Sequence, residues 1–402
     1  MNESGFRFAY DPGVIRHGRG CVADLAGEIA ALDCERALVV CGRTVGSTPA
    51  VIDPIREGLG DRLAGVFDET TPEKRLSTAI SGAERMDDLD ADALVAVGGG
   101  SSLDIAKAIS AVAASAAPPE NVAAQFGASG ALPVPEADLP PIAAVPTTLA
   151  GADLSILAGL TAHPDSDPVD EPVEGGVGDP RLMPAALFYD PALVETTPRE
   201  ILAASAMNGF NKGVETLYAA NATPITDGTA IRGLAVLSDA LPTLSGDPDS
   251  WATGDVLRGI VLVQYGISRP DGTTLSLLHA FGHGLTANSA VQQGAAHAIV
   301  TPHALRYLLE NADGRWGLLA DAFGIDAAER SADAVGEAIV EEVTAVRDCL
   351  DLPTRLRDVE DLSRDDLDAV AADTAADSLL GNCPPGLDPT AEDLRDVLDA
   401  AW

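Results

Sequence analysis

The first half of the chain alternates short apolar runs with stretches of helical periodicity. We expect these runs to be strands at residues 37–42, 64–69, 93–97, 141–148 and 185–191. Strands that alternate with helices form a parallel sheet covered on both faces. We therefore predict an α/β domain over residues 1–190 that contains a doubly wound parallel sheet. Within it, residues 163–180 are acidic and rich in proline and glycine, so we expect a surface loop there.

The strand signals stop near residue 191, and the remaining patterns are helical. Breaks between these patterns fall at residues 245–250, 268–273 and 383–388. We predict an all-α C-terminal domain over residues 191–402, so that the chain has two domains of similar length.

The charge of the chain excludes several classes of partner. It has 62 acidic and 25 basic residues, for a net charge of −37 at pH 7. Such a surface repels phosphate backbones and anionic lipids, so we expect neither nucleic-acid nor membrane partners. The acids are spread along the whole chain, and only three residues are lysine: Lys74, Lys107 and Lys212. This composition is typical of proteins from extreme halophiles; an ordinary acidic protein is the alternative.

Several features of the sequence indicate the cellular compartment of the protein. No apolar run approaches the roughly 20 residues that cross a bilayer, and the N-terminus shows no secretory signal. The five cysteines are scattered, without a CxxC pair, which fits a reducing compartment. We expect a soluble, cytoplasmic homodimer whose partner is a small-molecule substrate.

One segment of the α/β domain has the pattern of a phosphate-binding turn. The strand at 93–97 leads into three glycines and two serines, and a helix starts near Leu103. Glycines let a diphosphate approach the backbone, and the N–H groups at a helix start attract anions. A tight turn capped by Ser102 is the alternative interpretation. The predicted cofactor-binding residues of this segment are Gly98, Gly99, Gly100, Ser101, Ser102, Asp104 and Lys107.

Two further strand ends are candidates for the same site. Thr147 and Thr148 follow the strand near 141–146, at the edge where open α/β sheets bind ligands. The alternative for them is a capped loop. Gly42 and Arg43 follow the strand at 37–41, at the place where folds that select NAD commonly have a carboxylate. Arg43 could instead bind a 2′-phosphate, although it could also simply point to solvent.

The second half contains two pairs of polar residues with helical spacing. Asn208 and Lys212 are four apart in "SAMNGFNKGVET", and His279 and His283 are four apart in "LLHAFGHG". Residues at i and i+4 share a helix face. Four of the six histidines lie within residues 279–303, which favours a functional site over a structural use.

With these segments in view, the chain resembles the iron-containing alcohol dehydrogenase superfamily, and within it the maleylacetate reductases. The resemblance is carried by "GGGSSLDIAKA", "FAYDPGVIRHGRG", "PTTLAGADLS", "GDPRLMPAALFYDPAL", "SAMNGFNKGVETLYA" and the ending "LDAAW". It implies an α/β domain that binds NADH or NADPH, a helical domain, and hydride transfer. It also aligns Gly42 with an Asp that NAD-preferring members place there, so NADPH is slightly favoured.

The resemblance also implies a metal site that this chain has altered. Members that need iron bind it with one Asp and three His. The corresponding positions are Asn208, Lys212, His279 and Gln293, so three of the four ligands are changed and no metal is expected. The ammonium of Lys212 could replace the charge of the metal. His283 corresponds to a histidine that the family keeps beside the metal and is the candidate proton donor. The predicted catalytic residues are therefore Lys212, His279 and His283.

Two other functions remain open from the sequence. The altered ligands would suit a nucleotide-binding pseudoenzyme that acts as a sensor or partner. A lyase similar to dehydroquinate synthases shares the fold but requires a metal, and the lost ligands count against it.

Overall fold

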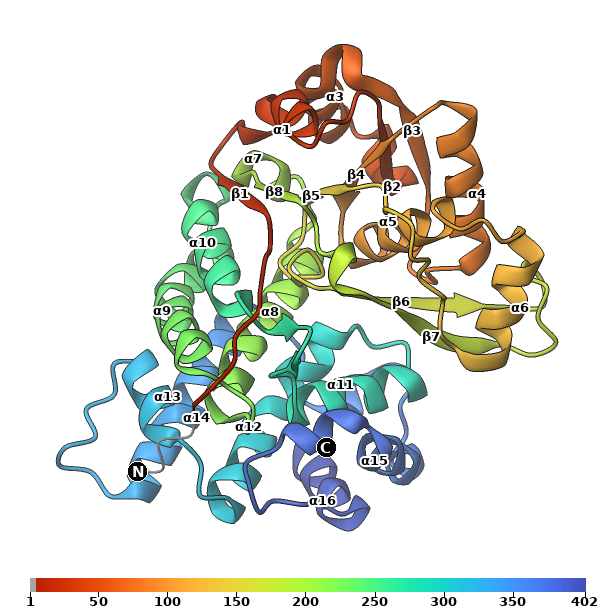
Figure 1. The fold of residues 1–402 in the computed structure, drawn as a ribbon. Helices are drawn as coiled ribbons and strands as arrows, with labels where there is room; N and C mark the ends of the chain where they lie inside the picture. The colour runs from red at the N-terminus through yellow and green to blue at the C-terminus, as the bar shows by residue number, and fades with distance from the viewer. Residues whose placement is uncertain (1–4) are drawn as a thin grey trace. The chain divides into compact units, whose positions relative to one another are not determined.

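The computed structural model describes residues 5–402 (Figure 1). The chain forms two compact units. The first, Ala9–Thr197, is the α/β unit. The second, called here the helical unit, contains Pro198–Trp402 together with the described residues up to Phe8.

A six-stranded parallel sheet lies at the centre of the α/β unit (Figure 1). In spatial order its strands are β1 (Val14–His17), β8 (Ala186–Tyr189), β5 (Ile142–Pro146), β4 (Ala93–Gly98), β2 (Ala37–Gly42) and β3 (Leu63–Thr70). The helices of the unit are α1 (Leu25–Ala31), α2 (Arg43–Ser47), α3 (Pro49–Leu59), α4 (Leu76–Asp88), α5 (Gly100–Ala113), α6 (Pro119–Ser129) and α7 (Pro191–Val194). The predicted parallel α/β architecture is confirmed.

Helices cover both faces of this sheet, because its strands are apolar on both sides. Leu38 and Val40 of β2 pack with α4 and α5 on one face. Val39 and Cys41 of the same strand pack with α1 and α3 on the other face. Successive strand residues point to opposite faces, so this alternation separates the two cores. The strand therefore reads as a continuous apolar run, as expected for a parallel sheet.

Three strands of the α/β unit differ from the predictions. Strands β1 and β6 (Leu157–Ala162) were not predicted. Residues 163–180, predicted to be a loop, contain strand β7 (Val173–Gly178), which pairs antiparallel with β6. The loop prediction was therefore wrong for that part. Gly175 and Gly176 leave β7 with little side-chain signal, and their backbone lies against neighbouring carbonyls where a Cβ would not fit.

Apart from one short pair of strands, the second unit consists of helices, as predicted. They are α8 (Arg199–Tyr218), α9 (Pro224–Ala240), α10 (Thr253–Gln264), α11 (Leu277–Asn288), α12 (Gln293–Asn311), α13 (Trp316–Ala322), α14 (Ala332–Cys349), α15 (Leu367–Ala376) and α16 (Ala391–Ala401). Two short strands, β9 (Ser268–Arg269) and β10 (Gly272–Thr273), form a small antiparallel pair. Within residues 5–402, none of the helices is both long enough and apolar enough to span a bilayer.

Helix α8 is a core helix whose polar residues are mostly buried. Most of its side chains are buried, including Asn208, Asn211 and Glu215. Lys212 is half-buried. Buried polar groups need partners, so α8 presents polar chemistry to the helices packed around it, among which are α9, α10 and α12.

Candidate functional site

The three-glycine segment forms the turn from β4 to α5. Gly98 has φ 136°, a conformation that favours glycine, and a Cβ there would lie 3.0 Å from the hydroxyl of Ser102. Gly99 is the residue before the helix, and Gly100 and Ser101 open it. The first N–H groups of a helix have no acceptor within the helix. This turn therefore has the geometry of an anion-binding site.

The two threonines lie beside this turn, as the sequence suggested. Thr147 donates its backbone N–H to the carbonyl of Gly98 at 3.0 Å. A Cβ on Gly99 would come within 3.2 Å of the methyl group of Thr148. The motifs after β4 and β5 are therefore in contact, because these neighbouring strands pair in parallel and end at the same edge of the sheet.

Gly42 lies at the same edge, as the last residue of β2. Strand β2 is the other neighbour of β4. Strand β3, which follows β2 along the chain, pairs with one edge of β2. Strand β4, which comes next, pairs with the other edge, so the strand order reverses between β2 and β4. Ligands of open α/β sheets bind at such a reversal. Arg43 is exposed beside it, at the start of α2.

Three residues predicted to bind the cofactor are buried and already bonded within the protein. The hydroxyl of Ser102 lies 2.8 Å from that of Thr70, at the end of β3. Asp104 accepts a hydrogen bond of 2.6 Å from Lys74. Lys107, which is fully buried, donates to the backbone carbonyls of Ala152 at 2.7 Å and Leu157 at 3.0 Å. These contacts favour a structural role for the three residues over direct contact with a cofactor.

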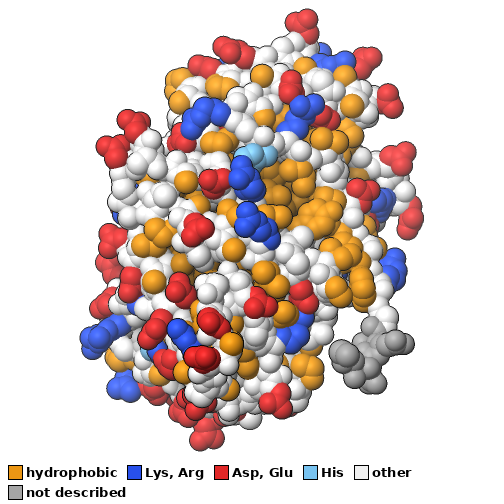
Figure 2. All heavy atoms as spheres, turned by 90° about the vertical axis from the view of Figure 1, so that its left-hand side faces the viewer, with side chains coloured by type: hydrophobic (Ala, Val, Ile, Leu, Met, Phe, Trp, Pro, Cys, Tyr) orange, Lys and Arg blue, Asp and Glu red, His pale blue; other side chains and the backbone are white. Residues whose placement is uncertain are grey.

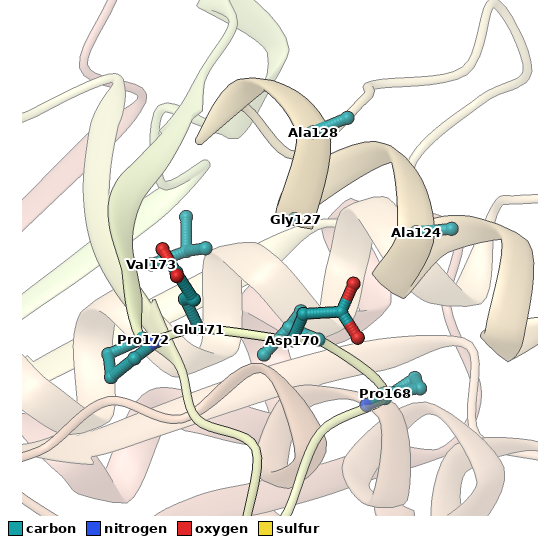
Figure 3. A pocket seen from close by; sticks show the side chains of 9 residues that line it. Ala124, Gly127, Ala128, Pro168, Asp170, Glu171, Pro172 and Val173 are labelled. Atoms are coloured by element: carbon teal, nitrogen blue, oxygen red, sulfur yellow. The ribbon is translucent and has the colours of Figure 1, made fainter.

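A separate hollow in the α/β unit lies between α6 and the segment before β7 (Figure 3). Its volume is about 640 Å³, and its lining consists of small or proline residues together with Asp170 and Glu171. Figure 3 shows both carboxylates beside this hollow. None of the lining residues belongs to the turns after β2, β4 and β5, so the hollow is distinct from the predicted cofactor site.

In the helical unit, two of the residues aligned with metal ligands are in direct contact. Asn208 of α8 donates its amide to the side-chain oxygen of Gln293, at the start of α12, over 3.3 Å. Lys212 is one turn further along α8. Burial lowers the pKa of His279 in α11, and the charge of Lys212 lowers it further.

The sequence analysis missed Glu215, which holds His279. One oxygen of the fully buried Glu215 carboxyl accepts the backbone N–H groups of Ser276 and His279 at 3.0 Å each, at the start of α11. The other oxygen hydrogen-bonds Nδ1 of His279. A signal was present in the sequence, because Asn208, Lys212 and Glu215 have the spacing i, i+4, i+7 of one helix face.

His297 lies against His279 in the same buried region. The two rings meet edge to face, with centroids 4.6 Å apart. A Cβ on Gly282 would lie 2.4 Å from Nε2 of His297, so the imidazole packs onto the backbone of α11. Within the described part of the chain, neither nitrogen of His297 has a hydrogen-bond partner, and neither has Nε2 of His279.

The second histidine of α11 has a different environment. The side chain of His283 is 53% exposed, and its Nδ1 lies 2.7 Å from a carboxylate oxygen of Asp377. The sequence analysis did not identify Asp377, which is 94 residues away along the chain. His283 is therefore the one of the two that solvent can reach.

Burial determines the protonation of the two buried imidazoles, those of His279 and His297. It lowers the pKa of His279 and of His297 well below the ordinary value, and the charge of Lys212 lowers both further. Both imidazoles are therefore neutral at pH 7. Burial also raises the pKa of Glu215 to about 7, although His297 opposes that shift.

These shifts predict how stability depends on pH. Below about pH 6.5, the unfolded chain protonates the side chain of His297 while the folded chain does not, so the free energy of unfolding falls as pH falls. His297→Asn should make this fall shallower, by up to about 1.4 kcal/mol per pH unit. Glu215 acts in the opposite sense up to about pH 7.

Urea unfolding between pH 5 and 7.5 at one fixed salt concentration measures the effect. All three tryptophans, Trp251, Trp316 and Trp402, lie in the helical unit, so their fluorescence reports on it. Replacing the exposed His17 of the other unit by Asn is the control. An unchanged pH slope in His297→Asn would contradict the neutral state of this imidazole.

The donor set at the aligned positions does not fit an iron or zinc ion. Two amides, one imidazole and an ammonium supply no anionic ligand, and an ammonium repels a cation. The nearby carboxyl of Glu215 is occupied by His279 and two backbone N–H groups. Among residues 5–402, no group of three or more His, Cys, Asp or Glu side chains is arranged to hold a metal.

Known proteins resemble this chain over both of its units. The family model "Iron-containing alcohol dehydrogenase" matches residues 12–191, and "Fe-containing alcohol dehydrogenase family, C-terminal" matches residues 202–402. The chain is 30% identical to the maleylacetate reductase of Sphingobium indicum over 307 residues, which are 75% of each protein. It is 26% identical to the lactaldehyde reductase of Escherichia coli K12 over 393 residues, 96% of this chain and 97% of the relative.

A solved structure extends the comparison to the fold. The sulfoacetaldehyde reductase from Bifidobacterium kashiwanohense in complex with NAD+ superposes with a TM-score of 0.85 and 19% identity, covering 99% of each chain. The two relatives compared by sequence are reductases, so the alternative of a binding-only pseudoenzyme gains no support. The two family models together cover nearly all of the sequence, and the chain belongs to the iron-containing alcohol dehydrogenase family.

Proposed function

We propose that this protein is an NADPH- or NADH-dependent reductase that works without a bound metal ion. The family match makes it an oxidoreductase. Its relatives support a small oxo- or enoyl-acid, aldehyde or alcohol as the substrate. The proposal that the enzyme works without a metal rests on the side chains at the family's ligand positions, where Asn208, Lys212 and Gln293 now stand.

The residues of the helical unit can replace what a metal would do. The reduced nicotinamide supplies the hydride when it is bound. The ammonium of Lys212 stabilises the negative charge that develops on the substrate oxygen, as an oxyanion donor does. His283, the exposed histidine, provides a proton to that oxygen. His279 is neutral and held at Nδ1 by Glu215, and among the described residues its buried Nε2 has no hydrogen-bond partner.

Metal analysis tests the proposal directly. Protein purified in high salt should contain well under one equivalent of iron or zinc, and EDTA should leave the turnover of NADPH with oxo-acids unchanged. As a matched positive control, Asn208→Asp with Lys212→His and Gln293→His restores the family's ligand types and should increase metal uptake. Stoichiometric metal in the wild type, with activity lost on chelation, would overturn the metal-free function.

The turn after β2 supports a preference for NADPH. Gly42 offers no carboxylate to repel a 2′-phosphate, and the exposed Arg43 can supply a fork of donors to it. Gly42→Asp should shift the ratio of kcat/KM towards NADH by about 1–3 kcal/mol. A Cβ at this position lies 3.2 Å from the carbonyl oxygen of Thr70, so Gly42→Ala is the control for crowding. The same ratio in both variants would show that this turn does not select the cofactor.

We also propose a cytoplasmic homodimer adapted to high salt. Acidic side chains are scattered over the face that Figure 2 presents, which supports a carboxylate-rich surface hydrated in salt. Salt of about 1 M reduces the screening length to roughly 3 Å, so the self-repulsion of such a surface becomes tolerable. Sedimentation and thermal unfolding over a series of KCl concentrations test the dimer and the salt requirement together.

A further inference from the structure

Two histidines on successive turns of α11 are each held at Nδ1 by a carboxyl group. Glu215 holds His279 in the buried region, and Asp377 holds the half-exposed His283. The second pair is the one that solvent reaches. Its acceptor is itself largely buried, because the side chain of Asp377 is 14% exposed whereas that of His283 is 53% exposed.

The carboxylate of Asp377 is fixed by the backbone. It precedes the short 3₁₀ helix Ser378–Asn382, and its Oδ1 accepts the N–H of Leu379 at 2.9 Å. Its Oδ2 is left to face His283 at 2.7 Å. Burial acts to raise the pKa of Asp377, but the hydrogen bonds from His283 and Leu379 lower it below its ordinary value. An ionised carboxylate can only accept, so Nδ1 of His283 must carry a hydrogen.

We propose that Asp377 is the positioning residue of His283. It accepts the Nδ1–H and thereby fixes both the ring orientation and the tautomer. The other nitrogen, Nε2, is left to exchange a proton with the substrate. This inference rests on the proposed function, in which His283 is the proton donor.

The proton balance of the step is simple. In the protonated imidazole, both nitrogens carry hydrogen. As hydride reaches the substrate carbon, the Nε2–H bond of His283 breaks and its proton goes to the substrate oxygen. The imidazole is left as the neutral Nδ1–H tautomer, still bonded to Asp377, and water returns the proton after the product leaves.

Asp377→Asn is the informative variant. Its amide can donate to Nδ1, which favours the opposite tautomer with hydrogen on Nε2. We expect kcat to fall about 10- to 100-fold with little change in KM, a part of the 10²–10⁴ that a general acid contributes. Asp377→Glu keeps an acceptor and should recover some of the loss. In His283→Ala, the added Asp377→Asn change should cause no further loss.

Asp373→Asn is the matched control. Asp373 lies one turn earlier, on α15, and its carboxylate accepts a 2.7 Å hydrogen bond from Asn288 of the same helix α11. The variant removes one acidic charge and one contact to α11 without touching a histidine. Its turnover should equal that of the wild type.

Nitrogen-15 NMR of labelled histidines provides a readout that does not need turnover. The ring of His283, assigned by its loss in His283→Ala, should show the Nδ1–H tautomer in the wild type and in Asp373→Asn, and the Nε2–H tautomer in Asp377→Asn. An unchanged tautomer, or a normal rate in Asp377→Asn while His283→Ala is slow, would overturn the role of Asp377. A normal rate in His283→Ala would instead remove His283 from the proposed mechanism, and the role of Asp377 with it.

Discussion

Replacing Lys212 by Met should lower kcat far more than it raises KM. The loss should be about 2–4 kcal/mol of transition-state stabilisation, which corresponds to a fall in rate of roughly 30- to 1000-fold. The reason is that Lys212 is the one cation among the four aligned positions, where it stands with two amides and an imidazole. An interaction made mainly in the transition state affects kcat and kcat/KM alike, and leaves KM nearly unchanged.

Steady-state kinetics of Lys212→Met and Lys212→Arg at one fixed salt concentration measure this. The arginine variant keeps the charge but spreads it over a planar fork, so it should retain part of the activity. Binding of NADPH should be the same in both variants, since the predicted cofactor turn belongs to the other unit. A methionine variant with normal kcat would show that Lys212 has a structural role alone.

Replacing Gly100 by Asp should abolish useful binding of NADPH and NADH. The backbone N–H groups of Gly100 and Ser101 are free of helical acceptors and face the predicted diphosphate. A carboxylate placed among them would repel the diphosphate and compete for the same donors. Losing charge-assisted hydrogen bonds of this kind costs about 3 kcal/mol, so Kd should rise by at least about 100-fold.

Gly100 suits this test because the fold tolerates a side chain there. A Cβ would lie 3.7 Å from that of Ala152, an ordinary contact, whereas at Gly98 the backbone conformation itself favours glycine. Gly100→Ala is therefore the control, and it should bind the cofactor nearly as well as the wild type. Fluorescence titration with NADPH, alongside circular dichroism, separates lost binding from lost folding. Equal affinities in the two variants would remove the phosphate-binding role from this turn.

The main sheet could be predicted because its strands are apolar on both faces. β2 reads "ALVVCG" and β4 reads "ALVAVG", and each lies fully inside the sheet. β1, with the sequence "VIRH", lies at the edge and is partly exposed, so its composition gives little signal. β7, "VEGGVG", is a strand because its backbone pairs with β6, and no side-chain periodicity indicates that.

The residues of the candidate site also differ in how far the sequence could predict their positions. Gly98, Thr147 and Gly42 could be placed together from the sequence, because each lies at the carboxyl end of a strand of one parallel sheet. The hydrogen-bond partners of the polar residues could not be predicted from the sequence. Asp377 reaches His283 across 94 residues, and Thr70 reaches Ser102 across 32, so both contacts depend on how the helices and strands pack. Local periodicity carries no information about such pairs.

The burial of Lys107 has a practical consequence for chemical labelling. With its ammonium buried and bonded to backbone carbonyls, this amine is out of reach of reagents dissolved in water. Two other lysine side chains remain, and Lys74 forms an ion pair with Asp104. Inactivation by an amine-selective reagent could therefore be traced by peptide mapping to Lys74, to Lys212 or to the N-terminal amine.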